Sequence, residues 1–218
     1  MPGPDINELI TRAARAELHP IGCVQRGRSR IWLDDHRWWV TVVEFQPSSG
    51  SKGTYLNVGA CWLWHTKDYF TFDDGYRVDS FQSARNLEGF ADALPGMAAQ
   101  ARVEVLKCRA RFPTVHAVAE HLTSKAVGSP SIWDHYHAGI ANGLAGRFAD
   151  AERHLRTASG IEAPDAVWVS RLKAECHLLL PLVGNASVLR EVVANAVAAS
   201  REVHKLMPLA GNVFSDVT

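Results

Sequence analysis

The chain has 218 residues, and 47% of them are hydrophobic, which is enough apolar material for one large domain or two small ones. This hydrophobic content excludes a disordered chain. Lys and Arg number 23, Asp and Glu number 23, and both halves of the chain are nearly balanced. We therefore expect no nucleic-acid partner, because binding to phosphates depends on a basic surface.

The chain carries no sign of secretion or membrane insertion. Its N-terminal residues show no basic segment followed by an apolar run, and therefore no signal peptide. The longest apolar stretch, 178–183, contains Pro181 and is far too short to span a bilayer, so we expect no membrane association. The four cysteines are far apart and form no C-x-x-C pair for a metal or for redox chemistry. We expect a cytoplasmic protein with reduced thiols and no cofactor.

The first predicted element is an amphipathic helix that begins after Asp5 and ends at Pro20 and Gly22. Its apolar residues recur at helical spacing and form one stripe. The stripe needs a surface to pack against, and we expect the helix to lie on the sheet that follows it. The stripe consists of Ile6, Leu9, Ile10, Ala13, Ala14 and Leu18.

Residues 23–81 predict an antiparallel sheet, because apolar and β-branched residues alternate there in runs separated by turn residues. The second run is apolar on both faces, as in a central strand. In the third run, Gly59 marks a bulge or a close approach of two backbones. The predicted strands cover 28–33, 38–45, 55–64 and a short segment that ends at Val78, with turns at 34–37, 47–53 and 73–75.

From Ser83 onward the apolar residues recur with a period of about 3.6, which predicts helices. The first predicted helix, over 87–111, contains Pro95, and we expect it to break or kink there. The later helices are expected to begin after Pro113, to run from Ser131 to Leu144, and to cover 165–180 and 186–206.

These patterns predict an α+β fold. An N-terminal helix and an antiparallel β-sheet occupy 1–82, and a helical bundle occupies 83–218. The loop at 128–130 marks a sub-boundary within the helical part.

One helical segment, YHAGIANGLAGRFADAERHLRTAS, carries small and large residues at the spacing of two closely packed antiparallel helices. Residues 135–160 resemble a single tetratricopeptide-type helical hairpin, although His135 stands where that repeat usually has Trp. One repeat is too few for a superhelix, so the resemblance implies a helical bundle with tetratricopeptide-like packing. The residues that carry the resemblance are Gly139, Gly146, Phe148, Ala151, Leu155 and Ala158.

A second resemblance covers about residues 6–65. It rests on Gly22, Arg26-Gly27-Arg28, Trp32, Asp34, Val43-Glu44-Phe45-Gln46, Ser48-Ser49 and Tyr55-Leu56-Asn57-Val58-Gly59. This part of the chain resembles a bacterial family that is known only as a domain of unknown function. The resemblance implies an α+β fold and a bacterial source, and it implies no activity.

Arg26, Arg28 and Arg30 alternate in sequence, and on a strand they would project from one face as a row of guanidinium groups. Such a row could hold a phosphate or a carboxylate, because Arg offers paired donors. It could instead be a solvated strand face, or it could pair with nearby carboxylates. For charged stripes the solvated face is the more frequent outcome.

Glu44, Gln46 and Asn57 are polar residues inside otherwise apolar strands. A buried carboxylate needs a partner, and we expect an Arg of the row to pair with Glu44. The polar side chains could line a ligand pocket on the sheet, or Gln46 and Asn57 could satisfy backbone groups where the strands end. The candidate ligand-binding residues are Arg26, Arg28, Arg30, Glu44, Gln46 and Asn57.

Five tryptophans fall within 33 consecutive residues, 32–64. Exposed rings on a strand could stack on nucleobases or on a peptide. Burial preferences favour a place in the core. These residues are Trp32, Trp38, Trp39, Trp62 and Trp64.

No catalytic or metal motif is found. The chain has neither a G-x-S-x-G elbow nor a phosphate-binding loop. His116, Glu120 and His121 have the spacing H-x-x-x-E-H, which places the two imidazoles about 140° apart around a helix, so they do not predict a metal site.

The sequence favours a non-enzymatic binding protein of the bacterial cytoplasm, with a protein or peptide partner on its helical half. The alternative is a small-molecule or nucleotide-handling enzyme with an Arg/Glu pocket on the sheet. A single cavity lined by Arg28, Glu44 and Asn57 would favour that alternative.

Overall fold

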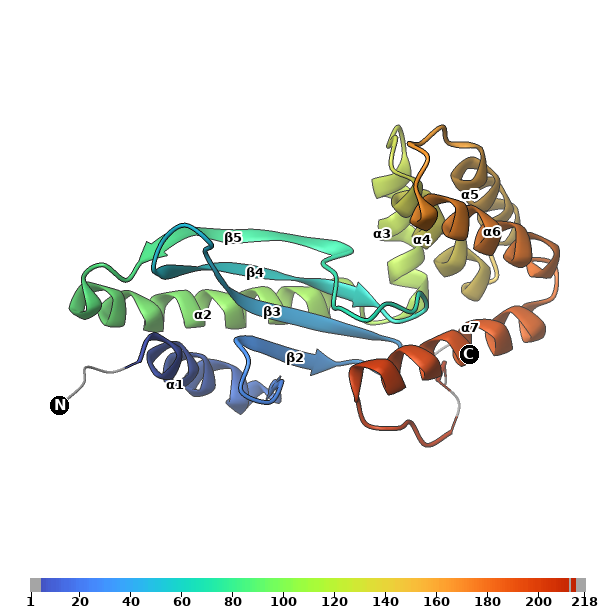
Figure 1. Cartoon of the computed structure of the whole chain (residues 1–218). Helices are drawn as coiled ribbons and strands as arrows, with labels where there is room; N and C mark the ends of the chain where they lie inside the picture. Colours follow the sequence, from blue (N-terminus) through green and yellow to red (C-terminus); the bar gives the residue numbers. More distant parts are fainter. Residues whose placement is uncertain (1–4, 212, 215–218) are drawn as a thin grey trace. The chain divides into compact units, whose positions relative to one another are not determined.

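The computed structural model describes residues 5–211, 213 and 214, and it confirms the α+β fold. A helix comes first, a five-stranded antiparallel sheet follows, and helices make up the rest (Figure 1). The chain divides into two compact units. Unit 1 holds the chain up to Ala110 together with Val203–Lys205, and unit 2 holds Arg111–Glu202 and the residues from Leu206 on.

Helix α1 (Ile6–Leu18) has the predicted start, end and apolar stripe. The carboxylate of Asp5 accepts a hydrogen bond from the backbone N–H of Asn7, which satisfies one of the free donors of the first turn. A 3₁₀ turn, η1 (His19–Ile21), follows, and Gly22 then reverses the chain at φ 90°, a conformation that glycine adopts without strain.

The strands lie in sequence order across the sheet, and each pairs antiparallel with the next. They are β1 (Val24–Gln25), β2 (Ile31–Asp35), β3 (Trp39–Pro47), β4 (Gly53–Trp62) and β5 (Asp74–Ser83). The predicted central strand is confirmed, because β3 is the third of the five. The strand predicted over 28–33 begins only at Ile31, because residues before it form a turn in which Ser29 bonds back to the carbonyl of Arg26.

Two glycines bring β4 and β5 close together. Gly59 faces Gly75 across the ladder, and a Cβ on Gly59 would lie only 2.5 Å from the Cα of Gly75. The predicted close approach at Gly59 is confirmed, and the irregular register of this ladder lies elsewhere, between Thr54 and Asn57. The fourth strand was expected to be short and to end at Val78, but β5 runs on to Ser83 because β4 offers pairing partners as far as Gly53.

Helix α2 (Leu87–Arg111) buries the predicted stripe, and Pro95, where a break or a kink was expected, does not break it. Pro95 removes one intrahelical hydrogen bond. Buried residues before and after Pro95, among them Phe90, Leu94 and Met97, pack the helix against the sheet, and this packing outweighs the lost hydrogen bond.

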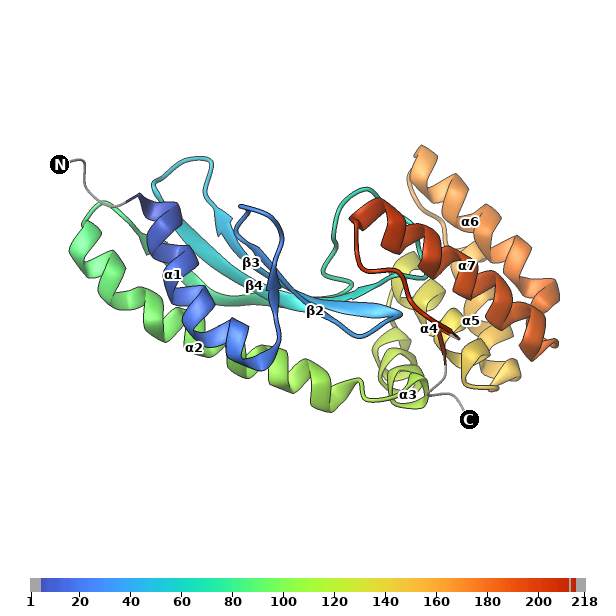
Figure 2. The same cartoon turned by 90° about the horizontal axis from the view of Figure 1, so that it is seen from below.

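The core of unit 1 lies between the sheet and the two helices. Figure 2 shows α1 and α2 on the same face of the sheet. Side chains of β3 and β4, such as Phe45 and Leu56, point to this face and pack with the stripes of both helices. Because side chains of a strand alternate, Glu44 and Gln46 point to the opposite face.

Unit 2 is built from helices that pack in succession. They are α3 (Val115–Ala126), α4 (Ile132–Leu144), α5 (Phe148–Gly160), α6 (Val167–Leu179), which continues into the 3₁₀ turn η2 (Leu180–Leu182), and the greater part of α7 (Ala186–His204). The predicted cap is confirmed at Ser131. Helix α3 begins after Pro113 as expected, and Thr114 caps it by accepting a hydrogen bond from Ala117 N–H.

The predicted close crossing of α4 and α5 is confirmed. A Cβ on Gly139 would lie 2.7 Å from Cγ of Leu155, so only glycine fits there. Ala151 is fully buried at the same crossing, and Gly146 ends the turn between the helices with φ 76°.

The change from strand to helix expected near residue 82 is also found, but the compact units divide after Ala110, because α2 belongs with the sheet.

Candidate functional site

The six candidate side chains do not gather in one pocket. Arg28 and Arg30 line a groove beside α1, and Glu44 lies at its edge. Gln46 and Asn57 lie on the other face of the sheet, and Arg26 lies over the ring of Phe70, 5.0 Å from its centroid. The single cavity that would favour an enzyme is therefore not formed by these residues.

The placement of the three arginines on a strand was wrong. They lie in the turn between β1 and β2, where Gly27 has φ 55° and the backbone changes direction. Because a turn does not impose the two-residue alternation of a strand, the three guanidinium groups diverge. Arg26 turns to Phe70, while Arg28 and Arg30 turn to α1.

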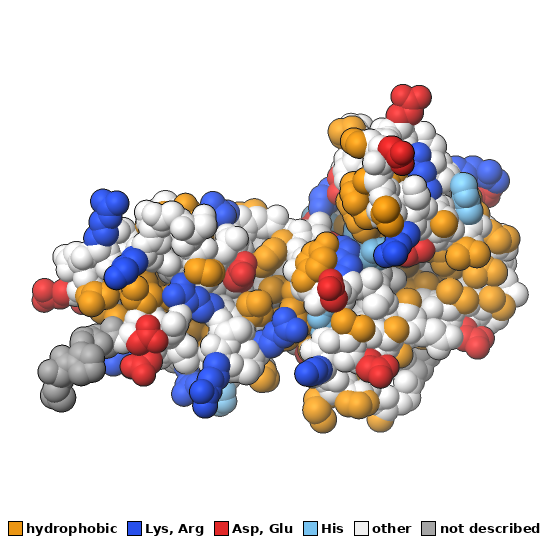
Figure 3. Space-filling model, viewed as in Figure 1, with side chains coloured by type: hydrophobic (Ala, Val, Ile, Leu, Met, Phe, Trp, Pro, Cys, Tyr) orange, Lys and Arg blue, Asp and Glu red, His pale blue; other side chains and the backbone are white. Residues whose placement is uncertain are grey.

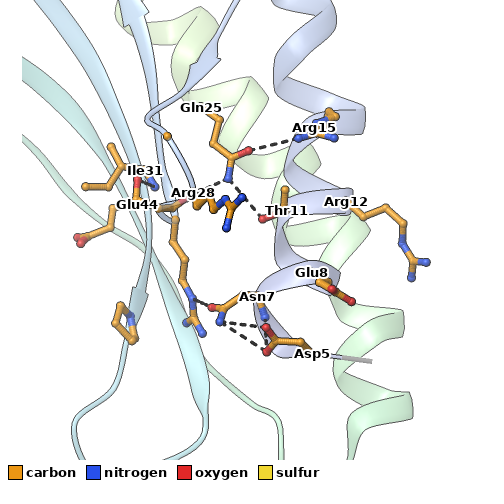
Figure 4. A pocket seen from close by; sticks show the side chains of 14 residues that line it. Asp5, Asn7, Glu8, Thr11, Arg12, Arg15, Gln25, Arg28, Ile31 and Glu44 are labelled. Atoms are coloured by element: carbon orange, nitrogen blue, oxygen red, sulfur yellow. Dashed lines mark hydrogen bonds between the residues drawn. The ribbon is translucent and has the colours of Figure 1, made fainter. Parts of the chain in front are cut away.

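A groove of about 1170 Å³ separates α1 from the β1–β2 turn (Figure 4). Arginines come from both of its walls: Arg12 and Arg15 from α1, and Arg28 and Arg30 from the turn. Figure 4 shows Arg28 directed across the groove toward Thr11, whereas the guanidinium of Arg12 points away from the β1–β2 turn. The sequence reasoning missed the two arginines of α1, although their three-residue spacing on the polar face of a helix was a visible sign.

The cations of the groove differ in their partners. Arg30 donates to Oδ1 of Asn7 at 2.7 Å and to the carbonyl of Gly53 at 3.4 Å, which are both neutral. Partial burial lowers the pKa of Arg30, and Asp5 opposes this effect. Arg12 and Arg28 make no hydrogen bond or ion pair with any residue that the structure describes.

Glu44 pairs with an amide on the open face of the sheet, not with the arginine row, so that expectation was wrong. Nδ2 of Asn57 donates to Oε2 of Glu44 at 3.3 Å and to Oε1 of Gln46 at 3.0 Å. Arg77, from β5, donates to the same Gln46 oxygen at 3.0 Å and lies 3.9 Å from the centroid of the Tyr55 ring. The register explains the pairing, because Glu44 and Asn57 are direct neighbours across β3 and β4.

The five clustered tryptophans are core residues, each at most 3% exposed. Trp38, Trp62 and Trp64 stack nearly parallel, with centroids 5.1 to 6.1 Å apart. A platform of exposed rings for nucleobases is therefore not found at these positions. Sequence reasoning had favoured the core for them.

An ion-pair network ties α2 to the sheet, and sequence reasoning missed it. Arg109 donates from Nε and Nη2 to both oxygens of the buried Asp34, at 2.9 and 2.8 Å, and from Nη2 to the carbonyl of Ile21. His36 lies 2.6 Å from the same carboxylate. Hydrogen bonds and the nearby cations lower the pKa of Asp34 despite its burial. Nothing in the sequence links residues so far apart.

The four cysteines are free thiols and are all buried. Burial raises the pKa of Cys23 and of Cys176 to about 12 and that of Cys61 to about 11. Because the thiolate is the reactive form, none of these three is an activated nucleophile at neutral pH.

Unit 2 presents an aromatic face, defined here as Trp133 of α4 with Trp168 of α6, and the buried His137 of α4 packs against Trp133. Trp133 stacks on Trp168 with an interplanar angle of 11° and on His137 with 23°. Trp168 is 47% exposed, and its neighbour Val167 is 71% exposed. The four-residue spacing of Trp133 and His137 was visible in the sequence, but nothing linked them to α6.

Two histidines of unit 2 form a buried pair at the α4–α5 crossing. Nδ1 of His135 lies 3.1 Å from Nδ1 of His154, and Nε2 of His135 lies 3.1 Å from the carbonyl of Ser129. On α3, Glu120 pairs with Arg147 while His121 packs against Phe112. Within the described residues, no three His, Cys, Asp or Glu side chains are grouped as metal ligands.

Basic and acidic side chains are interspersed on the face seen in Figure 3, while apolar side chains gather over the helices of unit 2. No described helix is both long enough and apolar enough to cross a membrane. No family model, no curated protein and no solved structure matches this chain.

Proposed function

We propose that this chain is a non-enzymatic binding protein of the bacterial cytoplasm and that its helical unit holds a protein partner. The observation that carries the proposal is the aromatic face of α4 and α6. Trp133 packs against the next helix, and the half-exposed Trp168 and the exposed Val167 leave an apolar surface open to solvent. Tryptophans of this kind supply much of the binding energy at protein interfaces.

The packing of unit 2 supports this use. Tyr136 of α4 donates to Oε2 of Glu175 on α6 at 2.8 Å, so the two helices that carry the aromatic rings are also joined by a hydrogen bond. The close crossing at Gly139 holds α5 against α4. A rigid pair of aromatic rings loses little conformational entropy when a partner binds.

The enzyme alternative has lost its main support. It required Arg28, Glu44 and Asn57 in one cavity, but Asn57, which bonds to Glu44, does not line the groove that holds Arg28. The thiols are buried, so they do not offer a nucleophile instead.

The test is affinity capture from the native host with three forms of the tagged chain: wild type, Trp168→Ala and Leu178→Ala. Leu178 is the matched control, because it is an exposed apolar residue on the same helix, 71% exposed, and outside the aromatic face. We expect the wild type and Leu178→Ala to recover the same proteins and Trp168→Ala to lose them. The absence of any reproducible partner, or an unchanged set with Trp168→Ala, would overturn the proposal.

A further inference from the structure

The groove beside α1 continues into a second hollow. That hollow, of about 470 Å³, lies around the short edge strand β1 and is lined by Val24, Trp32 and His19. The two hollows share Arg15, Gln25 and Gly27 in their linings. They flank α1 from Asp5 to His19, which at 1.5 Å per residue is about 21 Å. A trough of this length accommodates an extended peptide of about six residues.

The shape favours a peptide over a small molecule. Small-molecule sites enclose most of their ligand. This trough is instead open to solvent, with α1 on one side and the β1–β2 turn and β1 on the other. The backbone N–H of Arg26 donates to the carbonyl of Ile31 in β2. Hydrogen-bonded and non-hydrogen-bonded residues alternate along an antiparallel strand, so the backbone N–H and C=O of Gln25 point away from β2.

The positive charge in the trough is only partly compensated. Four arginines line the larger hollow, and their carboxylate neighbours are Asp5, Glu8 and Glu44. The carboxylate of Asp5 caps α1 and also acts on Arg30, and that of Glu44 bonds to the neutral Asn57 on the other face, so four cations meet three carboxylates and exceed them by one. In a chain with no net charge, this excess is local.

Neither Arg28 nor Arg30 forms an ion pair with a described carboxylate. Arg30 is partly buried and donates only to neutral acceptors, and the nearby Asp5 offsets only part of the desolvation of its charge. Arg28 is directed across the trough and bonds to no described residue (Figure 4). A carboxylate placed between them would accept paired, charge-assisted hydrogen bonds.

The other end of the trough has an apolar wall beside Arg15 and His19. Val24 is 68% exposed, and the ring of the buried Trp32 forms part of the wall beside it. A ligand that fills the whole length must therefore be anionic over one part and apolar over the next, which a single peptide segment supplies.

We infer that the trough along α1 binds an extended acidic peptide of a partner protein, with carboxylates at Arg28 and Arg30 and an apolar side chain at Val24. The trough lies in unit 1, so this inference goes beyond the aromatic face of the proposed function and is tested separately from it.

The test is a fluorescence anisotropy titration with labelled peptides. The acidic probe is a run of glutamates followed by Val and Leu; the second probe has glutamines in place of the glutamates, and the third has one phosphoserine among those glutamines. We expect the full chain to bind the acidic probe, and Arg28→Gln to weaken that binding at least about ten-fold, as loss of a charge-assisted hydrogen bond implies.

The matched control is Arg85→Gln. Arg85 is also exposed, and its side chain bonds to no described residue, but it lies outside the trough. It should leave the affinity unchanged. Glu8→Gln should strengthen binding by a few-fold, because it removes one of the opposing negative charges. Neither Arg28 nor Glu8 supports the fold through a side-chain bond to a described residue, so unchanged thermal unfolding is expected for both variants.

Four results would overturn the inference: no binding of the acidic probe to the wild type, equal affinity for the glutamine probe, an equal loss with Arg85→Gln, or tighter binding of the phosphoserine probe. The last would assign the trough to a phosphorylated partner. None of these results depends on Trp168, so failure here leaves the capture experiment on unit 2 unaffected.

Discussion

Asp34 is a buried carboxylate that both Arg109 and His36 contact. The fork of Arg109 meets both oxygens, and the cation, in a side chain 34% exposed, is partly shielded from water. Removal of one partner from such a pair leaves the other charge uncompensated, which costs more than the pair itself contributes.

We predict that Asp34→Asn lowers the free energy of unfolding of unit 1 by about 2–4 kcal/mol. Urea unfolding followed by tryptophan fluorescence measures this, because five tryptophans lie in unit 1. Arg102→Gln breaks the exposed pair with Glu17 and should change stability by less than about 0.5 kcal/mol. Equal effects of the two substitutions would show that burial does not decide how much stability is lost when an ion pair is broken.

The pH dependence of unit 2 should depend on His154. The carbonyl of Ser129 accepts from Nε2 of His135, so Nδ1 of His135 accepts the single proton that His154 offers. Nε2 of His154 is buried and has no partner among the described residues. Burial, and then the neighbouring His135 and Arg153, lower the pKa of His154, while Asp150 opposes the effect.

A lowered histidine pKa means that the unfolded chain binds the proton first. Stability is therefore lost as the pH falls below the ordinary value of 6.5 and continues to fall until the native pKa is reached, by at most about 1.4 kcal/mol per pH unit for one proton. We expect His154→Gln, which can still donate to His135, to remove this part of the slope. Urea unfolding monitored by circular dichroism between neutral and mildly acidic pH measures it; identical slopes in the two proteins would contradict the prediction.

At the scale of the elements, the α4–α5 crossing depends on the absence of one methyl group. We predict that Gly139→Ala destabilises unit 2 by about 1–3 kcal/mol, because the new Cβ would meet Leu155, including its backbone nitrogen at 3.3 Å. Gly160→Ala is the control, since a Cβ there meets nothing within 4 Å and alanine favours the helix. Thermal unfolding should separate the two, and equal stability would contradict close packing at Gly139.

The elements themselves were largely predictable from the sequence, because periodicity and caps are local. The start of α1 at Asp5, the central place of β3 and the crossing at Gly139 follow from residues a few positions apart. The errors came where distant packing decides. Helix α2 passes through Pro95 because the sheet holds it on both sides, and no local pattern reports that support.

At the scale of the whole molecule, periodicity located the change from strands to helices but not the border between the units. The stripe of α2 shows that it must be buried, yet it does not show against which surface. The six candidate residues do not line one cavity, and the reason is similar. Residue types identified Arg28 and Glu44, but the turn that carries the first and the strand face that carries the second were not readable from spacing.

Because the four thiols are buried, their reactivity in the natural chain reports local unfolding. Cys23, Cys61 and Cys108 belong to unit 1, and Cys176 alone belongs to unit 2. An alkylating reagent reaches a thiol only when its surroundings come apart. The rate at which the peptide that contains Cys176 is alkylated, measured by mass spectrometry, therefore reports local unfolding of unit 2. The rates for the other three cysteines report local unfolding of unit 1, and no label has to be introduced.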